Sequence, residues 1–369
     1  MSFRFIHSSD LHLGRKFASI PQPADGNIRG RLMEARHGAI AALARAARDH
    51  GAAHVLLAGD SFDTPTPSPA IVRQAVAAMA EAADLTWWLL PGNHDNLRDA
   101  EPLWDTVRQA GHSNIAVLDA DRPVAIRPGV TLLPCPVRFR AGASDPTEAM
   151  QQMEVPAGDI RIGLAHGGVT DFTDSGGAIA PDRDARARLD YLALGDWHGR
   201  MRVSDRVHYC GSPEQDRFKH GTPGLCLAVT IDAPGAAPQV TEVRTGHFHW
   251  TEIALQVTPG ADAVAALALA LPPTGRRDTL LRLRLSGRAR LAGRAELMAA
   301  ALAAAPEFAH FEIRADDLAT EHDASDLDLI DRPGGALRIA AEALAADPDD
   351  RIARDALARL YSYVKEGAE

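Results

Sequence analysis

Five short segments of this chain carry side chains that can bind metal ions, and they follow one another in a fixed order. They are Asp10-Leu11-His12, Gly59-Asp60-Ser61-Phe62-Asp63, Gly92-Asn93-His94-Asp95, His166-Gly167 and Gly195-Asp196-Trp197-His198. Each segment follows a hydrophobic run that is typical of a buried strand. The oxygen and imidazole ligands are therefore expected at strand ends along one edge of a sheet. Two divalent metals held there would hydrolyse a phosphate ester.

The ordered set of motifs resembles the signature of the calcineurin-like metallophosphoesterases. More narrowly, residues 7–14 are similar to the opening of the SbcD-type nuclease subunit of DNA-repair exonucleases, and Gly211-Ser212-Pro213-Glu214 resembles its GSP turn. The resemblance extends over residues 2–250. It implies an α/β fold, a four-layer α-β-β-α metallophosphoesterase sandwich.

The resemblance also implies a ligand set for two divalent ions. Asp10, His12 and His198 would bind the first ion, Asn93 and His166 the second, and Asp60 both. A carboxylate suits the shared position because it has two oxygens that can span neighbouring ions. Mixed oxygen and nitrogen ligands without a thiolate suit Mn²⁺ best, with Fe²⁺ as the alternative.

His94 directly follows Asn93, which places it near the metals. The resemblance implies that it is the general acid or transition-state stabiliser at the leaving oxygen. Asp95 is expected to orient its ring. Asp63 is expected to support the loop or a ligand histidine. Arg15 and Lys16, beside the first motif, are the best candidates for contacts to substrate phosphates.

One position departs from the family pattern, because Asp196 stands where a histidine usually binds the second metal. Ligation by Asp196 is the favoured interpretation. Its charge would cancel the remaining positive charge of a centre made of two dications, Asp10, Asp60 and a hydroxide. The alternative is that Asp196 lies outside the coordination sphere, which leaves the second metal under-coordinated.

The length of 369 residues suggests two domains. The catalytic domain would span 1–250. A small C-terminal α/β capping domain with closing helices would span 251–369, with a β-α-β-α-β pattern over 251–314 and an acidic loop over 316–331. Helices are also expected at 29–50, 69–83, 335–346 and 349–365, the last two meeting at Pro348. Loops are expected at 141–157 and 170–187, the second as a substrate rim.

The charge and the cysteines bear on partners and location. A net charge of −10 is unusual for a protein that binds DNA alone, so a partner is expected to supply much of the grip on DNA. The three cysteines have no CxxC spacing, and no apolar run is long enough to span a membrane. A metal motif also lies close to the first residue. We therefore expect a cytoplasmic protein without a leader.

The favoured function is therefore a Mn²⁺-dependent DNA exo/endonuclease subunit that acts in DNA repair or DNA-end processing. Its expected partner is an SbcC-like, SMC-type coiled-coil ATPase. A homodimer of this chain is a further assembly to consider. One alternative is a phosphoesterase of small molecules or phosphoproteins. Another is a scaffold subunit with a weakened metal site. The apolar stripe Ile352, Ala356, Leu357, Leu360, Tyr361 and Val364 either packs on its own domain or docks the ATPase.

Overall fold

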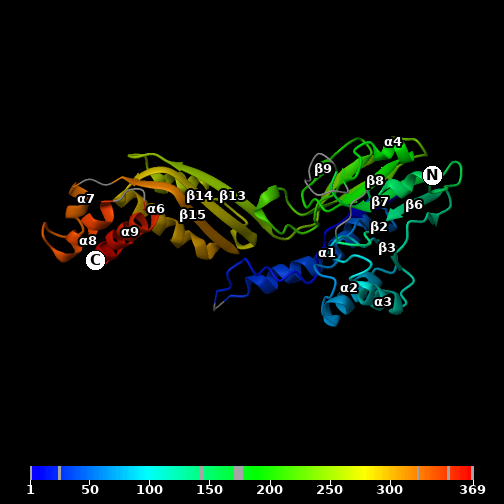
Figure 1. The fold of residues 1–369 in the computed structure, drawn as a ribbon, viewed down its shortest axis with the longest axis horizontal. Coiled ribbons are helices and arrows are strands. Elements are labelled where there is room, and N and C mark those ends of the chain that lie inside the picture. The colour runs from blue at the N-terminus through cyan, green and yellow to red at the C-terminus, as the bar shows by residue number, and fades with distance from the viewer. Residues whose placement is uncertain are drawn as a thin grey trace. The chain divides into compact units, whose positions relative to one another are not determined.

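The computed structural model describes residues 2–23, 26–140, 145–169, 178–321, 324–346 and 350–366. The chain divides into two compact units, Met1–His249 and Trp250–Glu369 (Figure 1). The first unit contains the five motifs, and the second contains none of them.

Two six-stranded sheets form the centre of the first unit. The first sheet has the order β12-β11-β1-β2-β3-β4 and consists of β12 (Gln239–Arg244), β11 (Leu225–Ile231), β1 (Phe3–Ser8), β2 (His54–Leu57), β3 (Thr86–Leu89) and β4 (Ile115–Val117). Strands β1 to β4 are parallel, and β11 is antiparallel to β1. Consecutive motif strands therefore end at the same edge.

The second sheet has the order β5-β6-β7-β8-β10-β9. Its strands are β5 (Val124–Arg127), β6 (Val130–Cys135), β7 (Ile160–His166), β8 (Tyr191–Gly195), β10 (Val207–Tyr209) and β9 (Met201–Arg202). Strands β6, β7, β8 and β10 run parallel. The last two motifs follow β7 and β8, so they too meet at one edge.

The layers follow from alternating side chains along the strands. Phe5 of β1 packs between the two sheets with Ile162 and Tyr191, whereas its neighbour Ile6 faces the helices. Helices α1 (Ile28–His50), α2 (Pro69–Glu81) and α3 (Glu101–Gln109) cover the first sheet, and α4 (Arg183–Ala187) lies with the outer cluster of the second. The predicted four-layer α-β-β-α sandwich is confirmed.

The expected loops contain short helical turns where the structure describes them. A 3₁₀ turn at Glu148–Gln151 buries Met150 within the predicted loop 141–157. Helix α4 occupies the end of the predicted loop 170–187. Residues 141–144 and 170–177 of these loops lie outside the described residues.

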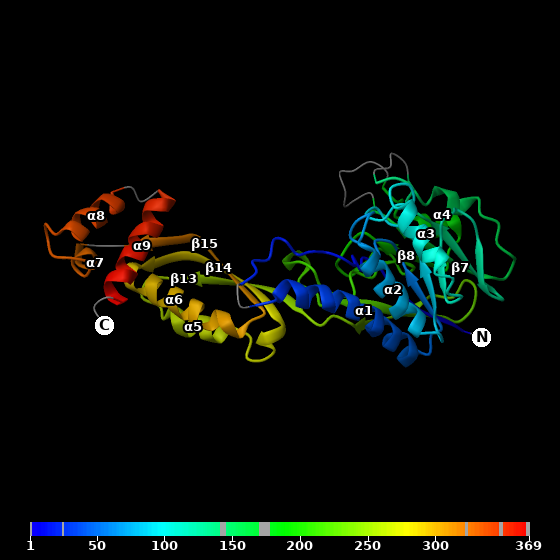
Figure 2. The ribbon, with the colours of Figure 1, turned by 90° about the horizontal axis from the view of Figure 1, so that it is seen from below.

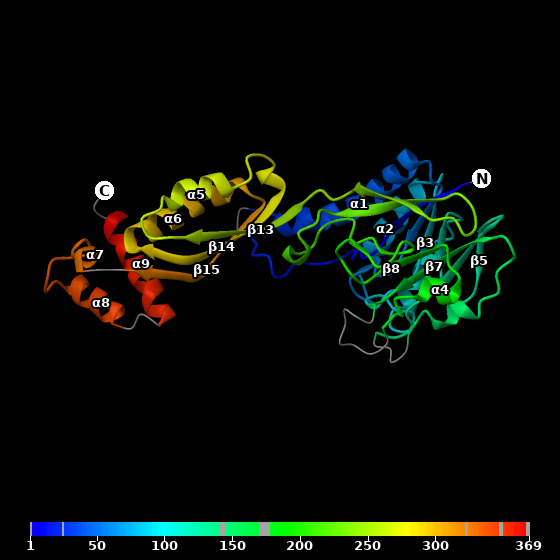
Figure 3. The same cartoon turned by 90° about the horizontal axis from the view of Figure 1, so that it is seen from above.

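The second unit is a three-stranded sheet with the order β13 (His249–Val257), β14 (Thr279–Arg290) and β15 (His310–Glu321). Helices α5 (Ala263–Ala270) and α6 (Leu291–Ala304) lie side by side on one face of it (Figures 2 and 3). The predicted acidic loop at 316–331 is wrong at its start and in its middle, whereas residues 329–331 contain neither helix nor strand. β15 continues through Glu321, because it pairs with β14 beyond a register shift and buries Leu318, and α7 (Ala324–Asp328) follows.

The chain closes with α8 (Ala336–Ala345) and α9 (Arg351–Glu366). Pro348, the predicted junction, lies outside the described residues. Leu357 and Tyr361 of α9 are buried in a cluster with Leu291 of α6, whereas Ile352 is 77% exposed. The inner part of the apolar stripe therefore packs on the core of its own unit, the first of the two interpretations.

Cys135, Cys210 and Cys226 are buried and free of disulfides. Among the helices of the described residues, none combines the length and the apolar character that a bilayer span requires.

Candidate metal centre

Each predicted ligand stands at or just beyond the carboxyl end of a parallel strand. Asp10, Asp60 and Asn93 follow β1, β2 and β3 of the first sheet. His166 is the last residue of β7, and the Asp196–His198 segment follows β8 in the second sheet. The edges of the two sheets are connected here, because the His166 side chain places Nδ1 2.8 Å from the backbone carbonyl oxygen of Ala58.

The backbone is strained at these ligands. Six non-glycine residues of the described chain have positive φ angles, and four of them are predicted ligands: Asp10 at 54°, His12 at 43°, Asp60 at 53° and Asp196 at 99°. Each such residue costs on the order of 1–3 kcal/mol, and such strain clusters at functional sites. The fold therefore holds these side chains in orientations that the isolated chain would avoid.

Gly59 and Gly195 must be glycines because other atoms of the site lie where a Cβ atom would be. A Cβ atom at Gly59 would lie 2.2 Å from His166 Nδ1, and one at Gly195 would lie 2.0 Å from the carbonyl oxygen of Ala58. Both distances are far inside van der Waals contact. The glycine before Asp60 and the glycine before Asp196 thus let the edges of the two sheets come together at the ligands.

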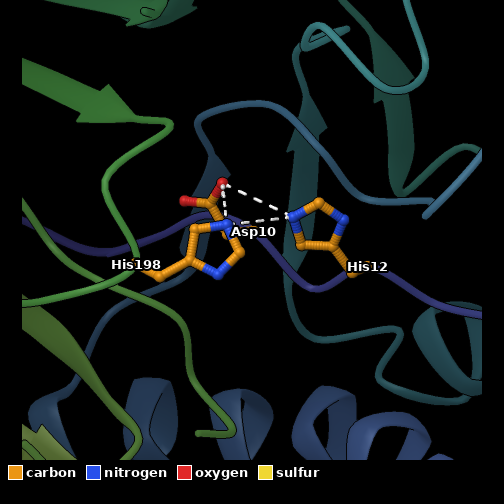
Figure 4. A group of neighbouring side chains, drawn as sticks. All are labelled: Asp10, His12 and His198. Atoms are coloured by element: carbon orange, nitrogen blue, oxygen red, sulfur yellow. Dashed lines mark hydrogen bonds and ion pairs between the residues drawn. The ribbon is translucent and has the colours of Figure 1, made fainter. Parts of the chain in front are cut away.

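Asp10, His12 and His198 form one group of ligand atoms (Figure 4). The Nε2 atoms of the two histidines are 3.2 Å apart, and they lie 3.9 Å (His12) and 3.7 Å (His198) from Asp10 Oδ1. Three ligand atoms converge on one point, which is the arrangement that a single cation requires.

Asp60 connects this group to a second one. Its Oδ2 lies 3.5 Å from His12 Nε2, and its Oδ1 lies 3.5 Å from His166 Nε2. The two oxygens of one buried carboxylate therefore face imidazoles of different groups. That is the geometry expected of a carboxylate shared by two ions.

The buried polar atoms fit two cations. Asn93 Oδ1 and His166 Nε2 are buried without a hydrogen-bond partner. Such atoms are rare in native structures and call for a water or an ion. Both residues are the ones that the resemblance assigns to the second metal, so the residues present fit a dinuclear centre.

Asp60 and His166 act on each other's charge. Burial raises the pKa of Asp60, but the His166 and His12 imidazoles lower it more, so that it lies below its ordinary value. Burial lowers the pKa of His166, but the Asp60 and Asp10 carboxylates outweigh it, so that it lies well above 6.5. The raised pKa means that the His166 ring tends to hold a proton in the metal-free protein. A cation that binds to this ring must displace that proton.

His94 lies at the edge of the same group, with Asp60 and His12. Its backbone N–H donates to Asp60 Oδ1 at 2.9 Å, and its Nδ1 lies 2.8 Å from the carbonyl oxygen of Asp63. Because a carbonyl only accepts, Nδ1 carries a proton. The Nε2 atom is then the one available to a substrate.

Asp95 does not orient the His94 ring, contrary to the expectation. Its carboxylate is buried and accepts hydrogen bonds from the backbone N–H groups of Phe62, at 3.0 Å, and Gly92, at 2.6 Å. Both oxygens are thus used to hold the second and third motif loops together. The carbonyl of Asp63 takes over the expected contact to the ring.

Asp196 lies beside the predicted ligands of the second ion. Its Oδ1 accepts a hydrogen bond from Asn93 Nδ2 at 3.1 Å and lies 3.8 Å from His166 Nε2. Its side chain is 31% exposed, in contrast to the buried Asp10 and Asp60. The contact to Asn93 turns the amide so that Oδ1 is the atom left without a hydrogen bond.

The outer nitrogens of the first-ion histidines lie beside two more carboxylates. Asp63 Oδ1 lies 3.2 Å from His12 Nδ1, which matches the expected supporting role of Asp63. Asp216 Oδ2 lies 3.0 Å from His198 Nδ1. Arg15 joins the two carboxylates, 2.9 Å from Asp216 and 3.9 Å from Asp63, whereas Lys16 is exposed. Arg15 is thus already paired at the border of the site.

Two buried residues of this region were not identified from the sequence. One is Asp216. The other is Arg36, whose guanidinium donates to the carbonyl oxygens of Asp10 at 2.7 Å and Leu11 at 2.6 Å. Arg36 stands four residues from both Leu32 and Ile40 on the apolar side of its helix, and that position was a signal of burial.

Comparison with known proteins identifies the family. The sequence profile of the calcineurin-like phosphoesterases matches residues 3–200, a range that includes all five motifs. Among solved structures, the crystal structure of TT1561 from Thermus thermophilus is similar, with 11% identity, a TM-score of 0.43, and coverage of 66% of this chain and 100% of that one. None of the curated proteins matches the chain. Because the profile covers more than half of its residues, this chain belongs to the calcineurin-like phosphoesterase family.

Proposed function

We propose that this protein is a Mn²⁺-dependent phosphodiesterase and serves as the nuclease subunit of a DNA-end-processing or DNA-repair complex with an SbcC-like coiled-coil ATPase. The observation that carries the phosphoesterase part is Asp60, whose two oxygens face His12 and His166 in adjoining ligand groups. When bound, two divalent cations supply an activated water and neutralise the phosphate oxygens.

The side chains of the site divide the remaining work. Asp10, His12 and His198 would hold the first ion, and Asn93 and His166 the second. His94 presents Nε2 to the leaving oxygen, because its Nδ1 is fixed on the carbonyl of Asp63. The ring can therefore deliver or share a proton as the ester bond breaks.

A diester is favoured over a monoester by the charge of the site. Asp196 adds a carboxylate 3.8 Å from His166. The resemblance would place a histidine, which can be neutral, at the position of Asp196. A less positive centre attracts a dianionic monoester less strongly than a positive one would, whereas a diester carries one charge only. This argument favours a phosphodiesterase over a phosphatase of small molecules or phosphoproteins.

The assignment to DNA rests on the resemblance of residues 7–14 and of the Gly211–Glu214 turn to SbcD-type subunits. The capping role of the second unit rests on the same resemblance. The net charge of −10 argues for a partner that contributes cationic surface, since phosphate contacts supply most of the affinity for a DNA backbone.

The test uses the full chain with Mn²⁺ and four substrates: double-stranded DNA, single-stranded DNA, bis(p-nitrophenyl) phosphate and p-nitrophenyl phosphate. We expect hydrolysis of the diester and of DNA, with the monoester the poorest substrate. Hydrolysis of the monoester alone would make the protein a phosphatase. Two bound metals without turnover of any substrate would favour the scaffold interpretation. His94→Ala is the matched inactive control.

A further inference from the structure

A pocket of about 900 Å³ adjoins the metal centre within the first unit. The segment Leu13–Ser19 forms one wall, Met33 of α1 the second, and residues between Thr64 and Ile71 the third. Asp63 and Asp216 also line it. Because these carboxylates contact His12 and His198, the pocket is one side chain away from the ligands of the first ion.

The charged groups of this pocket balance one another. Its cations are Arg15 and Lys16, and its anions are Asp63 and Asp216. Arg15 is already paired with both carboxylates, at 2.9 Å to Asp216 and 3.9 Å to Asp63. A pocket with this balance offers little attraction to a second phosphate. Its charge therefore suits an uncharged group.

The rest of the lining matches a heteroaromatic group. Leu13 and Phe17 are buried, and Met33 and Ile71 are half-buried, so the inner walls are apolar. Hydroxyl groups stand along one wall, from Thr64, Thr66 and Ser68. Ligand sites of this kind combine apolar walls with a few polar groups that orient the ligand. A nucleobase has apolar faces and a polar edge, as these walls require.

From the charge balance, the lining and the position beside the metal ligands, we infer that this pocket binds the nucleoside attached to the scissile phosphate. The inference rests on the proposed phosphodiesterase function and names the substrate class of that site. Arg15 is then a positioning residue at the border between the nucleoside and the metal centre. The pocket would contribute to the binding of nucleotides but not of inorganic phosphate.

The experiment compares ligands that differ only in the nucleoside. Calorimetry measures the binding of 3′-thymidine monophosphate, 5′-thymidine monophosphate and inorganic phosphate to the Mn²⁺-loaded full chain. We expect at least one nucleotide to bind more tightly than phosphate. Met33→Trp fills the pocket from α1, and it should weaken the binding of that nucleotide about tenfold, the size expected for the loss of one base contact. The affinity for phosphate should not change.

Two further variants make the result unambiguous. Gly38→Trp places the same side chain on α1 at a position where a Cβ atom meets nothing within 4 Å, and it should leave both affinities unchanged. Thr66→Trp enters the pocket from the exposed opposite wall and should repeat the Met33→Trp effect even if that variant folds poorly.

The inference is overturned if both pocket variants bind the nucleotide as the wild type does, or if they lose phosphate to the same extent. It also fails if the wild type binds neither nucleotide more tightly than phosphate, although cleavage of a simple diester would still support the proposed function. Selective nucleotide binding without diester cleavage would instead refute the proposed phosphodiesterase function and still support the nucleoside-binding pocket.

Discussion

Replacement of Asp216 by asparagine should weaken the first metal site while the second stays intact. Asp216 is buried, with its side chain only 1% exposed, and its Oδ2 lies 3.0 Å from His198 Nδ1. This contact fixes the ring so that Nε2 faces Asp10. Burial raises the pKa of Asp216, but the contact to His198 and the nearby Arg36 outweigh it and hold the pKa well below its ordinary value. The residue is therefore an anion in the folded protein.

The size of the effect follows from what the substitution removes. Asp216→Asn keeps an oxygen that can accept from His198 but loses the charge that supports a cation on the other side of the ring. Loss of such a carboxylate partner typically costs about 10- to 100-fold in metal affinity, or about 1.4 to 2.7 kcal/mol. Arg15 and Arg217, each 2.9 Å from Asp216, would lose this partner, and their charges act in the same direction. Their side chains are 27% and 38% exposed, so their repulsion is partly screened.

The assay is a calorimetric titration of the metal-free full chain with Mn²⁺, fitted to two sites. The matched control is Asp145→Asn, because Asp145 is also a poorly exposed carboxylate of the first unit, paired with Arg183 at 2.6 Å. The control should lose stability but keep both affinities. An unchanged first site in Asp216→Asn would refute the reasoning. An equal loss at both sites would point to a general disturbance of the fold.

Three other predictions concern the same unit. Asp60→Ala should lose metal and activity together, whereas His94→Ala should keep both metals and lose turnover; metal analysis that finds His94→Ala empty would contradict this division of roles. Asp196→Ala should lower the occupancy of the second metal only, and two fully occupied sites in that variant would show that Asp196 is not a ligand. Burial lowers the pKa of His7 to about 3 and that of His208 to about 4, both below the ordinary 6.5. As the pH falls, these two histidines therefore bind protons in the unfolded chain at a higher pH than in the folded protein. The free energy of unfolding should fall by about 1.4 kcal/mol per histidine and pH unit as the pH drops from 6.5 towards 4. In His7→Gln this slope should be shallower, and denaturant titrations that show the wild-type slope would exclude His7 as a source.

The strand-end motifs made the centre of the fold predictable from the sequence. Each ligand follows a short apolar run, and parallel strands bring such ends together whatever the intervening loops do. Helix α1 was equally predictable, because its apolar positions recur at helical spacing up to Gly51, which has a φ of 66° and ends the helix. Local pattern and tertiary structure agree at these positions.

The contacts that the sequence did not reveal depend on tertiary structure. Asp216 reaches His198 only because the segment after β10 returns to the same edge as β8, its neighbour in the second sheet. The end of β15 looks like an acidic loop, yet pairing with β14 and the burial of Leu318 outweigh the low strand propensity of aspartate. Contacts between distant segments decided both cases, and no local pattern encodes them.

The position of Asp196 shows how one substitution can change the balance of a whole centre. It hydrogen-bonds Asn93 and faces His166, so it acts on both residues expected at the second ion. Burial raises the pKa of Asp196, with His166 opposing this and Asp10 adding to it, whereas Asp60 has a lowered pKa at the shared position. A carboxylate that resists ionisation in the free protein gains most from a nearby cation, because the cation favours its charged form. The residue that departs from the family pattern is therefore, beside His166, a second group whose charge state should respond to occupancy of the second site.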